Sequence, residues 1–377
     1  MEVRFLHTAD WQIGMPAQFM SEEAASRYTE ARLDAIRRIG EVARERRCEF
    51  VVVAGDVFDA NLLGRRTVLR AVEAMTAVPV PLYLLPGNHD PLDPSTIYDA
   101  ADITAQLPPH VRVLRDHEPV VVRPGLEVVG APWRTKRPME DLVSAALRDL
   151  PADGTVRVAV GHGAVDGVMG VVRDEPSTIR LGAVEQAIAD GRVHYVALGD
   201  RHSTTRVGGT GRVWYSGTPE QTRFDETDPG NVLVVALDDA VRVEPVRVGR
   251  WRFLELAAAL NGPDDLEAFA SELQGIADKT RTLVRMLFTG TVSLAAHARL
   301  TEILEAQAAV FAGLEVDEAS DLAVRPDDFD FTTLGLAGFA RSALDELSAK
   351  AAGTDGDAEG AKGALELLYR LAAGART

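Results

Sequence analysis

The chain has 377 residues, 46% of them hydrophobic, which is enough for two or three domains with a substantial core. Its formal net charge of −17 is unfavourable for a protein that holds nucleic acid through its overall field, although divalent metals or a local basic path can reverse the local charge. The single cysteine, Cys48, excludes an intramolecular disulfide and a thiolate cluster, so a bound metal would be held by nitrogen and oxygen.

The sequence shows no sign of membrane insertion or secretion. No apolar run approaches the ~20 residues of a membrane span, and the chain enters a strand by Val3 without a basic and apolar leader. These features predict a cytoplasmic protein that makes no membrane contact.

The N-terminal part of the chain alternates apolar runs with amphipathic helical patterns. Strands are expected at 3–9, 49–55 and 80–85, with helices at 22–47 and 65–77 between them. This alternation predicts an α/β core.

From residue 111 the apolar runs shorten and turn residues become frequent. Strands are expected at 111–114, 120–122, 126–129, 156–160, 193–198, 212–216, 232–237 and 241–246. The last two are predicted to form a hairpin around Asp238 and Asp239. The core therefore continues as a mixed sheet.

After Val248 a second pattern begins. Strands and helices alternate at 252–256, 263–277, 281–289, 293–309 and 314–316, which predicts a small β-α-β-α-β domain. Two amphipathic helices follow at 333–350 and 361–373, separated by a Gly- and Asp-rich break at 353–360. The expected division is therefore 1–247, 248–326 and 327–377.

Polar residues able to bind a metal or move a proton follow five of the apolar runs, at strand ends where such groups belong. They are Asp10 and Gln12, Asp56, Asn88 and His89, His162, and Asp200 with His202. Each motif alone is typical of a helix cap, a turn or a structural histidine. Five of them in alternating strand and helix context indicate a single site.

The chemistry of such a site is that of paired divalent cations. Two cations ~3.5–4 Å apart need one carboxylate between them and about three further ligands each. Asp56, at the end of a central strand, is the natural bridge, and His89 is placed to protonate or stabilise a leaving oxygen. His7 lies three positions before Asp10 and is expected on the opposite face of its strand, in a structural role.

These motifs carry a family resemblance. Five of them resemble the ordered motifs of calcineurin-like metallophosphoesterases: Asp10, Gly55-Asp56, Gly87-Asn88-His89-Asp90, Gly161-His162 and Gly199-x-x-His202. Three stretches are similar to the SbcD-type DNA repair exonucleases, nuclease subunits that work with an SMC-like ATPase: His7-Thr8-Ala9-Asp10-Trp11, Gly55-Asp56-Val57-Phe58-Asp59 and Tyr215-Ser216-Gly217-Thr218-Pro219-Glu220. The resemblance implies a four-layered α/β/β/α sandwich with a small α+β capping domain and a C-terminal helical tail.

The resemblance also implies a ligand set. Asp10, Gln12, Asp56 and His202 would hold one metal, and Asp56, Asn88, His162 and Asp200 the other. Gln12 and Asp200 stand where the family usually has histidine, which makes the site richer in oxygen and favours Mn²⁺ or Mg²⁺. Arg201 either contacts a substrate phosphate or points to solvent.

The expected function is a metal-dependent phosphodiesterase of DNA, in which activated water attacks phosphorus in line and a 3′-hydroxyl leaves. The resemblance further implies an SMC-like ATPase partner, docked by the tail at about 330–377, and we expect a homodimer. Three alternatives stay open. The enzyme could act on nucleotides or other small phosphodiesters, the chain could be a non-catalytic scaffold with a decayed metal site, and the tail helices could fold back on their own domain.

Overall fold

The computed structural model describes residues 2–17, 19–168, 175–238, 240–325, 336–351, 353 and 357–374. The chain divides into two compact units, Met1–Trp251 and Arg252–Thr377. Three sequence expectations fall at least partly outside the described residues: the boundary between 326 and 327, Asp239 of the expected hairpin turn, and part of the break at 353–360. The division into three domains stays a prediction.

Two six-stranded sheets form the centre of the first unit. One has the strand order β12 (Val241–Arg247), β11 (Asn231–Leu237), β1 (Val3–Thr8), β2 (Val51–Val53), β3 (Leu82–Leu84) and β4 (Val111–Val113). The other has the order β5 (Val120–Arg123), β6 (Leu126–Gly130), β7 (Val156–His162), β8 (Tyr195–Gly199), β10 (Val213–Tyr215) and β9 (Thr205–Val207). Strands β1 to β4 are mutually parallel, as are β6 to β8, so their carboxyl ends meet at one edge of each sheet.

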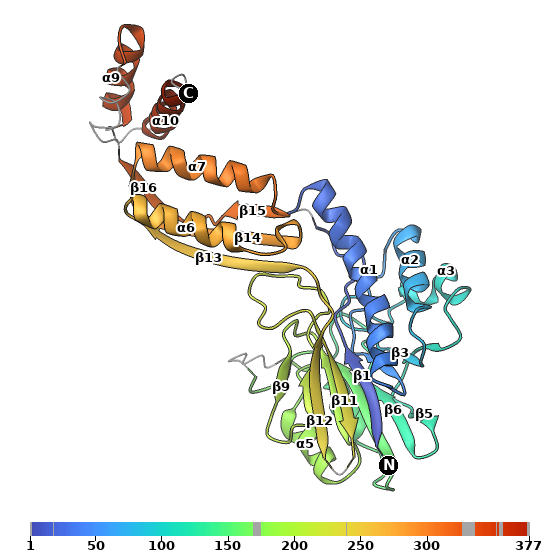
Figure 1. Ribbon diagram of the computed structural model, residues 1–377. Coiled ribbons are helices and arrows are strands. Elements are labelled where there is room, and N and C mark those ends of the chain that lie inside the picture. Colours follow the sequence, from blue (N-terminus) through green and yellow to red (C-terminus); the bar gives the residue numbers. More distant parts are fainter. Residues whose placement is uncertain are drawn as a thin grey trace. The chain divides into compact units, whose positions relative to one another are not determined.

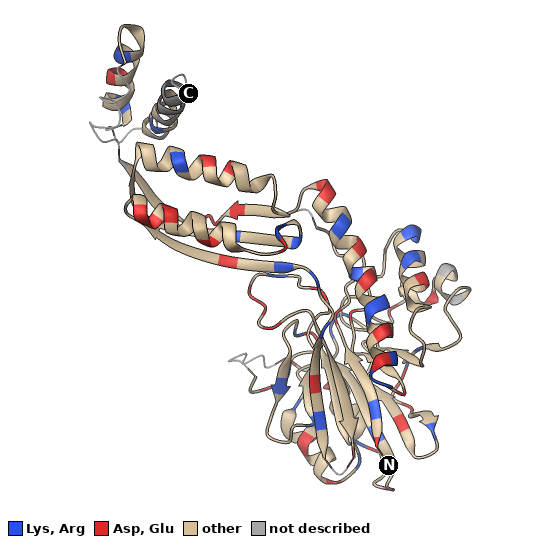
Figure 2. Ribbon diagram, viewed as in Figure 1, with Lys and Arg blue, Asp and Glu red and all other residues tan. Residues whose placement is uncertain are grey.

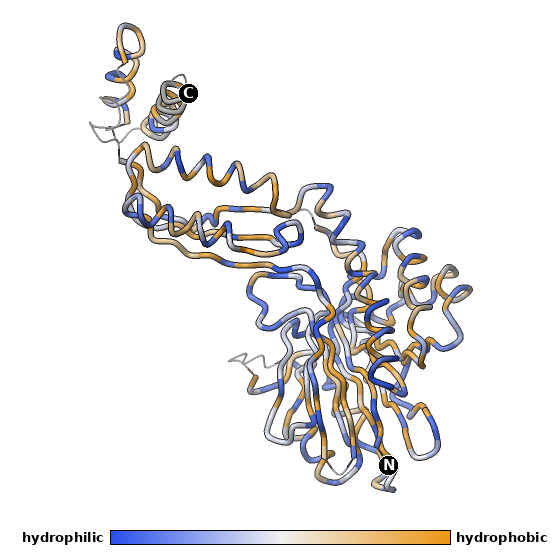
Figure 3. The backbone as a smooth tube through the Cα atoms, viewed as in Figure 1, coloured by the Kyte–Doolittle hydropathy of each residue, from blue (hydrophilic) through white to orange (hydrophobic). Residues whose placement is uncertain are grey.

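Helices cover the outer face of each sheet, and the inner faces pack on each other (Figure 1). Helices α1 (Glu22–Glu45) and α2 (Arg65–Met75) bury one set of apolar side chains on the first sheet, and α4 (Leu142–Leu147) and α5 (Leu181–Ala189) bury another on the second. A third cluster, with Phe5 and Val160, fills the space between the sheets. The expected four-layered α/β/β/α sandwich is confirmed, and its apolar strands stand out in Figure 3.

Most expected strands and helices lie within a few residues of their predicted bounds, but short elements were missed. The sequence pattern predicts no helix at α4 or α5, at α3 (Ala101–Thr104) or at the 3₁₀ turn η1 (Ile97–Asp99). Helices of four to nine residues show too few turns for a helical repeat to stand out from an apolar run.

The second unit contains a sheet of parallel strands with helices in the connections between them. Its elements are β13 (Arg252–Leu260), α6 (Pro263–Gly275), β14 (Thr282–Ser293), α7 (Leu294–Ala308), β15 (Gly313–Val316) and β16 (Asp321–Arg325). Strands β13, β15 and β16 all pair with the long central strand β14. Strand β16 was not predicted, because its alternation of Asp, Leu, Ala, Val and Arg covers only five residues.

The two tail helices, α9 (Phe339–Ala351) and α10 (Ala358–Gly374), pack on each other, and α10 also packs on α7. Their buried contact is small and apolar: Leu344 and Leu365 meet Leu294 at the start of α7. Phe339 and Leu371 of the same helices are exposed to 88% and 64%. Part of the predicted apolar stripe therefore folds back on its own unit, and part of it remains exposed. Among the described helices, none combines the length and apolarity that a membrane crossing needs.

Candidate metal centre

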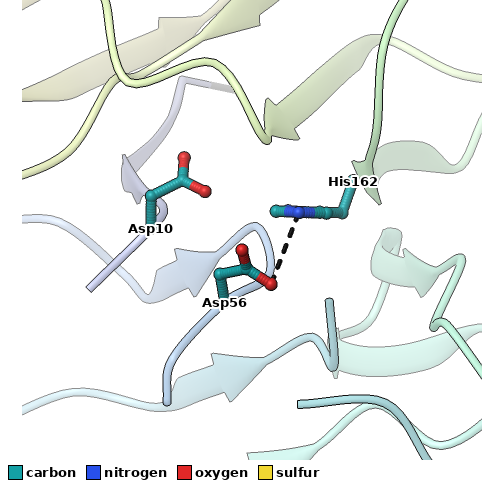
Figure 4. A group of neighbouring side chains, drawn as sticks. All are labelled: Asp10, Asp56 and His162. Carbon is teal, nitrogen blue, oxygen red and sulfur yellow. Dashed lines mark ion pairs between the residues drawn. The ribbon is translucent and has the colours of Figure 1, made fainter. Parts of the chain in front are cut away.

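The strand ends of the two sheets bring three buried ligand groups together. Asp10 follows β1, Asp56 follows β2 and His162 ends β7. One ligand atom of each lies within 4.8 Å of the others, and Figure 4 shows the three side chains converging. The His162 Nε2 atom is 3.5 Å from Asp56 Oδ1. The expected convergence of separate strand ends is therefore what the structure shows.

The backbone at this site is held in an unusual conformation. Asp10, Gln12, Asp56 and Asp200 have positive φ angles of 53°, 43°, 52° and 98°, and they are four of the seven non-glycine residues with positive φ in the described chain. The turns after β1 and β2 are joined by hydrogen bonds from Asp10 N to Gly55 O (3.0 Å) and from Gln12 N to Asp56 O (2.8 Å). Such strain persists where surrounding structure enforces it, and it is common at functional sites.

Two glycines leave the space that the ligands occupy. A Cβ atom on Gly55, which has a φ of +92°, would stand 2.1 Å from His162 Nδ1. A Cβ atom on Gly87 would stand 2.2 Å from Asp56 Oδ1. The glycine in each of these two motifs is therefore required for the approach of the ligand groups.

His162 is oriented so that its Nε2 atom faces the site. Its Nδ1 atom lies 2.9 Å from Ala54 O, which makes Nδ1 the protonated nitrogen of the neutral ring. Nε2 then carries a lone pair and lies 2.7 Å from the side-chain oxygen of Asn88. That oxygen faces acceptors only, including the carboxylate of Asp56, and a reversed amide would donate to them instead. A bound cation would also stabilise several acceptor atoms that face one another, because each of them could bind it.

His202 is fixed in the same way by a carboxylate. Its Nδ1 atom lies 3.0 Å from Glu226 Oε1 and 2.6 Å from Thr222 Oγ1, so Nε2 faces the site. An imidazole held by a carboxylate on its far nitrogen is the usual arrangement of a metal-binding histidine. The Gln12 amide nitrogen lies 3.1 Å from His202 Nε2, so ligation through the amide oxygen requires the amide to rotate.

His89 lies at the rim of the site, and its side chain is 41% exposed. Its Nδ1 atom is 3.0 Å from Asp59 O, and its Nε2 atom is 4.0 Å from Asp56 Oδ2. The loop that carries it is held by the buried carboxylate of Asp90, which accepts hydrogen bonds from Gly87 N and from the Tyr98 hydroxyl. His89 is therefore free to meet a ligand at the open side, whereas Asp90 has a structural task.

A pocket of about 300 Å³ opens beside these groups. Its lining includes Asp200, Arg201, His202, Tyr215 and Arg223. Asp200 Oδ1 lies 3.9 Å from His162 Nε2, while the Asp200 side chain is 34% exposed. The Arg201 guanidinium lines the pocket and donates to Thr205 Oγ1 at 2.9 Å. The pocket is therefore lined by the carboxylate of Asp200 and by two arginines, Arg201 and Arg223.

The electrostatics of the site favour a bound cation. Burial raises the pKa of Asp10 to about 6, against the opposing effect of His202 and His162. Burial also opposes protonation of His162, yet the carboxylates of Asp56, Asp10 and Asp200 outweigh it and raise its pKa. The cluster thus carries excess negative charge that a proton would neutralise in part. Clustered carboxylates, two oriented imidazoles and an amide fit divalent metal ions.

Several polar residues around the site escaped the sequence analysis. Glu226 and Thr222 orient His202, and Trp133 donates to His162 O at 2.8 Å. Nothing local marks Glu226, which lies 24 residues after its partner. His7 is buried between the sheets, where it contacts the Tyr195 hydroxyl (3.2 Å) and Leu198 O (3.1 Å), and burial lowers its pKa to about 3.

Comparisons with known proteins agree with this geometry. The family model of the calcineurin-like phosphoesterases matches residues 3–226. The chain belongs to this family. It is 26% identical to the SbcD subunit of the nuclease SbcCD from Escherichia coli (strain K12), over 72% of this chain and 74% of that protein. The protein of the same name from Rhodobacter capsulatus is 28% identical, over 88% of this chain and 92% of that protein. The predicted resemblance is confirmed.

Solved structures are more distant. TT1561 of Thermus thermophilus has a TM-score of 0.42 and 13% identity, over 66% of this chain and 100% of that chain. GAP50 of Plasmodium has a TM-score of 0.44 and 12% identity, over 66% and 85%.

The chain is a metal-dependent hydrolase of the calcineurin-like phosphoesterase family. Divalent metals supply Lewis acidity and activate water in such a site. The residues that would hold them here are the strand-end groups described above, among which Asp10, Asp56 and His162 form the buried centre.

Proposed function

We propose that the protein is a DNA phosphodiesterase, with exonuclease or endonuclease activity in DNA repair, that uses two divalent metal ions. The observation that carries the proposal is the buried cluster of Asp10, Asp56 and His162 beside an open pocket, in a chain similar to two proteins named as nuclease subunits. Mn²⁺ is the proposed metal and Mg²⁺ the alternative, because the ligand set is rich in oxygen.

Each candidate ligand has a proposed task. Asp10, Gln12, Asp56 and His202 would hold one cation, and Asp56, Asn88, His162 and Asp200 would hold the other, with Asp56 shared between them. Asp200 adds a third carboxylate, and its exposure leaves it room to turn towards a cation. Glu226 keeps His202 Nε2 facing inward by accepting the proton of Nδ1.

Two residues at the open side are proposed to act on the substrate. His89, whose Nδ1 is anchored on Asp59 O, presents Nε2 to the phosphate and stabilises the oxygen that leaves. Arg201 lines the pocket beside Asp200 and contacts a neighbouring phosphate. A catalytic His89 must contact the substrate, and its exposed side chain allows that contact.

The partner of the enzyme is proposed to be an SMC-like ATPase, as the resemblance to the SbcD-type exonucleases implies. The names of the relatives refer to one subunit of a nuclease, which is consistent with a second subunit. The exposed side chains of Phe339 and Leu371 supply an apolar contact for it.

Replacing both Phe339 and Leu371 by aspartate should abolish co-purification with the ATPase and leave the buried Leu344 and Leu365 contact intact. Unchanged co-purification would place the docking surface elsewhere. A homodimer and a cytoplasmic location belong to the same proposal.

One assay tests the catalytic proposal. Purified protein is incubated with linear and circular DNA, single- and double-stranded, and with a small aromatic phosphodiester, with Mn²⁺, Mg²⁺ or a chelator. We expect DNA cleavage with Mn²⁺ that Asp56→Asn lowers more than about 100-fold, because that change removes the bridging charge. Asp149→Asn, an exposed carboxylate away from the site, is the matched control.

The outcomes separate the alternatives. Cleavage of the small diester without cleavage of any DNA would identify an enzyme for small substrates. Mn²⁺ binding without any turnover would identify a scaffold with a decayed site. Cleavage by Asp56→Asn at the parental rate would remove the strand-end cluster as the active site.

A further inference from the structure

A further cavity lies between α1, α2 and the loop that follows Gln12. It has a volume of about 70 Å³ and is lined by three arginines, Arg32, Arg66 and Arg70, together with the hydroxyl-bearing Thr29 and Thr67. The metal centre and the pocket of Arg201 share none of these residues. We call this cavity the arginine pocket.

Arg32 is the buried member of the arginine pocket, with a residue exposure of 4%. Its Nη1 donates to the Tyr28 hydroxyl at 3.2 Å, its Nη2 lies 3.6 Å from Met15 Sδ, and its guanidinium carbon lies 5.2 Å from the centre of the Tyr28 ring. In the part of the chain that the structure describes, its Nε has no hydrogen-bond partner. Within the described residues, no carboxylate lies within 4.0 Å of the guanidinium. The buried carboxylate of Glu220 interacts with this charge electrostatically but does not contact it, so an anion in direct contact would add to its compensation.

The other two arginines differ in their partners. Arg70 forms an ion pair with Glu30, a carboxylate that Arg37 also contacts at 3.2 Å. Arg66 is exposed, and no hydrogen bond or ion pair joins its guanidinium to another described residue. Two of the three positive charges around the arginine pocket therefore lack a compensating carboxylate in contact.

The positive charge continues along the outer face of α2. A shallow hollow beside the arginine pocket is lined by Arg65, Arg66 and Arg70, with Leu69 and Glu73. Figure 2 shows basic residues gathered on this helix, in a chain whose net charge is −17. The arginine pocket is thus the inner end of a local basic surface.

We propose that the arginine pocket binds a phosphate group. A tetrahedral anion can accept the free Nε–H of Arg32, the fork of Arg66 and the hydroxyl of Thr67 together, whereas the Thr29 hydroxyl already donates to Ala25 O. A carboxylate offers two oxygens in one plane and leaves part of these donors unused. The size of the cavity admits one small anion and excludes a nucleobase.

The source of the phosphate rests on the proposed nuclease function. Ile13, Gly14 and Met15 lead from Gln12 to the wall of the arginine pocket, and three residues of extended chain span at most about 10 Å. A phosphodiester one or two nucleotides from the scissile bond lies within that reach. The pocket would then hold the substrate strand while the metal centre cuts it. Free phosphate has the same chemistry and is the other source.

The first arm of the test uses full-length protein in a chelator, so that the metal centre neither binds phosphate nor cleaves. Thermal unfolding is measured with inorganic phosphate and with chloride at equal ionic strength. The parent should gain stability from phosphate, and Arg66→Glu should lose that gain. Arg148→Glu changes an exposed arginine at the end of α4 and should keep it. Arg32→Met tests the buried cation, while Arg66→Glu keeps the test valid if that variant fails to fold.

The second arm measures binding of short single-stranded DNA as a function of salt, again in chelator. Loss of the Arg66 contact should lower affinity and reduce the slope of log affinity against log salt by about 0.7. A lost phosphate response with unchanged DNA binding assigns the arginine pocket to free phosphate. A parent without a phosphate response, or an equal response in Arg66→Glu, overturns the proposal, and neither result bears on cleavage at the metal centre.

Discussion

The strand-end site of the first unit and the helical end of the second unit are stabilised in opposite ways. The site gathers buried ionisable groups on turns with positive φ, where glycines leave no spare volume. The helical end depends on apolar contact among Leu294, Leu344 and Leu365. In the described part of the second unit, Thr282 is the only buried polar residue. The first region is built for placement of charge, and the second for burial of surface.

The contrast has a consequence for tolerance to change. Strained turns and packed ligands leave one acceptable residue at a position, whereas an apolar contact accepts several side chains of similar volume. Substitutions should therefore be most damaging at the glycines of the site, intermediate at the buried leucines and smallest at single ionisable groups.

The largest effect is expected for Gly55→Ala. Its new Cβ would stand 2.1 Å from His162 Nδ1, and its φ of +92° is unfavourable for alanine. Gly125→Ala is the matched control, with a φ of +79° and no atom within 4 Å of its Cβ. We expect the control to cost about 1 to 2 kcal/mol and Gly55→Ala more than about 4 kcal/mol, with loss of Mn²⁺ binding. Urea unfolding and Mn²⁺ titration calorimetry measure both, and equal costs would show that His162 moves aside freely.

A smaller effect is expected at the helical end. Leu365 of α10 is fully buried in an apolar cluster with Leu294 of α7 and Leu344 of α9, whereas Leu367 of α10 is 56% exposed. Leu365→Ala should cost about 2 to 5 kcal/mol and release α9 and α10, and Leu367→Ala should cost less than about 0.5 kcal/mol. Amide hydrogen exchange across α10 reports the release directly. If exchange in the two variants is the same, the tail helices are not held by this contact.

The sequence predicted the strand ends well, because ligand residues follow apolar runs directly and each run has a strand's length. It predicted neither the orientation of the ligands nor the partners that enforce it, since Glu226 and Asp90 act on residues of other loops or turns. Helices α4 and α5 were missed because short buried helices lack a visible repeat. The sequence did not predict the burial of Arg32, because an arginine in a long amphipathic helix is typical of the solvent-exposed face.

The smallest expected effect is the dependence of stability on pH that comes from one buried carboxyl group of the first unit, Glu220. Glu220 closes the predicted motif Tyr215–Glu220, is 1% exposed and accepts hydrogen bonds from Arg250 N and Trp251 N. Burial raises its pKa from 4.5 to about 7, although these backbone donors and Arg32 oppose the shift. Between those two values the folded protein holds a proton that the unfolded chain has lost.

The sign of the pH effect follows from that difference. The folded state binds more protons than the unfolded state, so the contribution of Glu220 to stability is complete below pH 4.5 and is lost as pH rises through about 7. The loss amounts to at most about 3 kcal/mol, at about 1.4 kcal/mol for each unit of pKa.

Glu220→Gln removes the titration while keeping a hydrogen-bond acceptor at the same place. The variant should therefore gain stability relative to the parent between about pH 5 and about pH 8. Urea unfolding across this range measures the difference between the two proteins, in which the titrations of Asp10 and Asp90 cancel. A difference that stays constant with pH would mean that Glu220 is ionised throughout, with its charge stabilised by the two backbone donors and by Arg32.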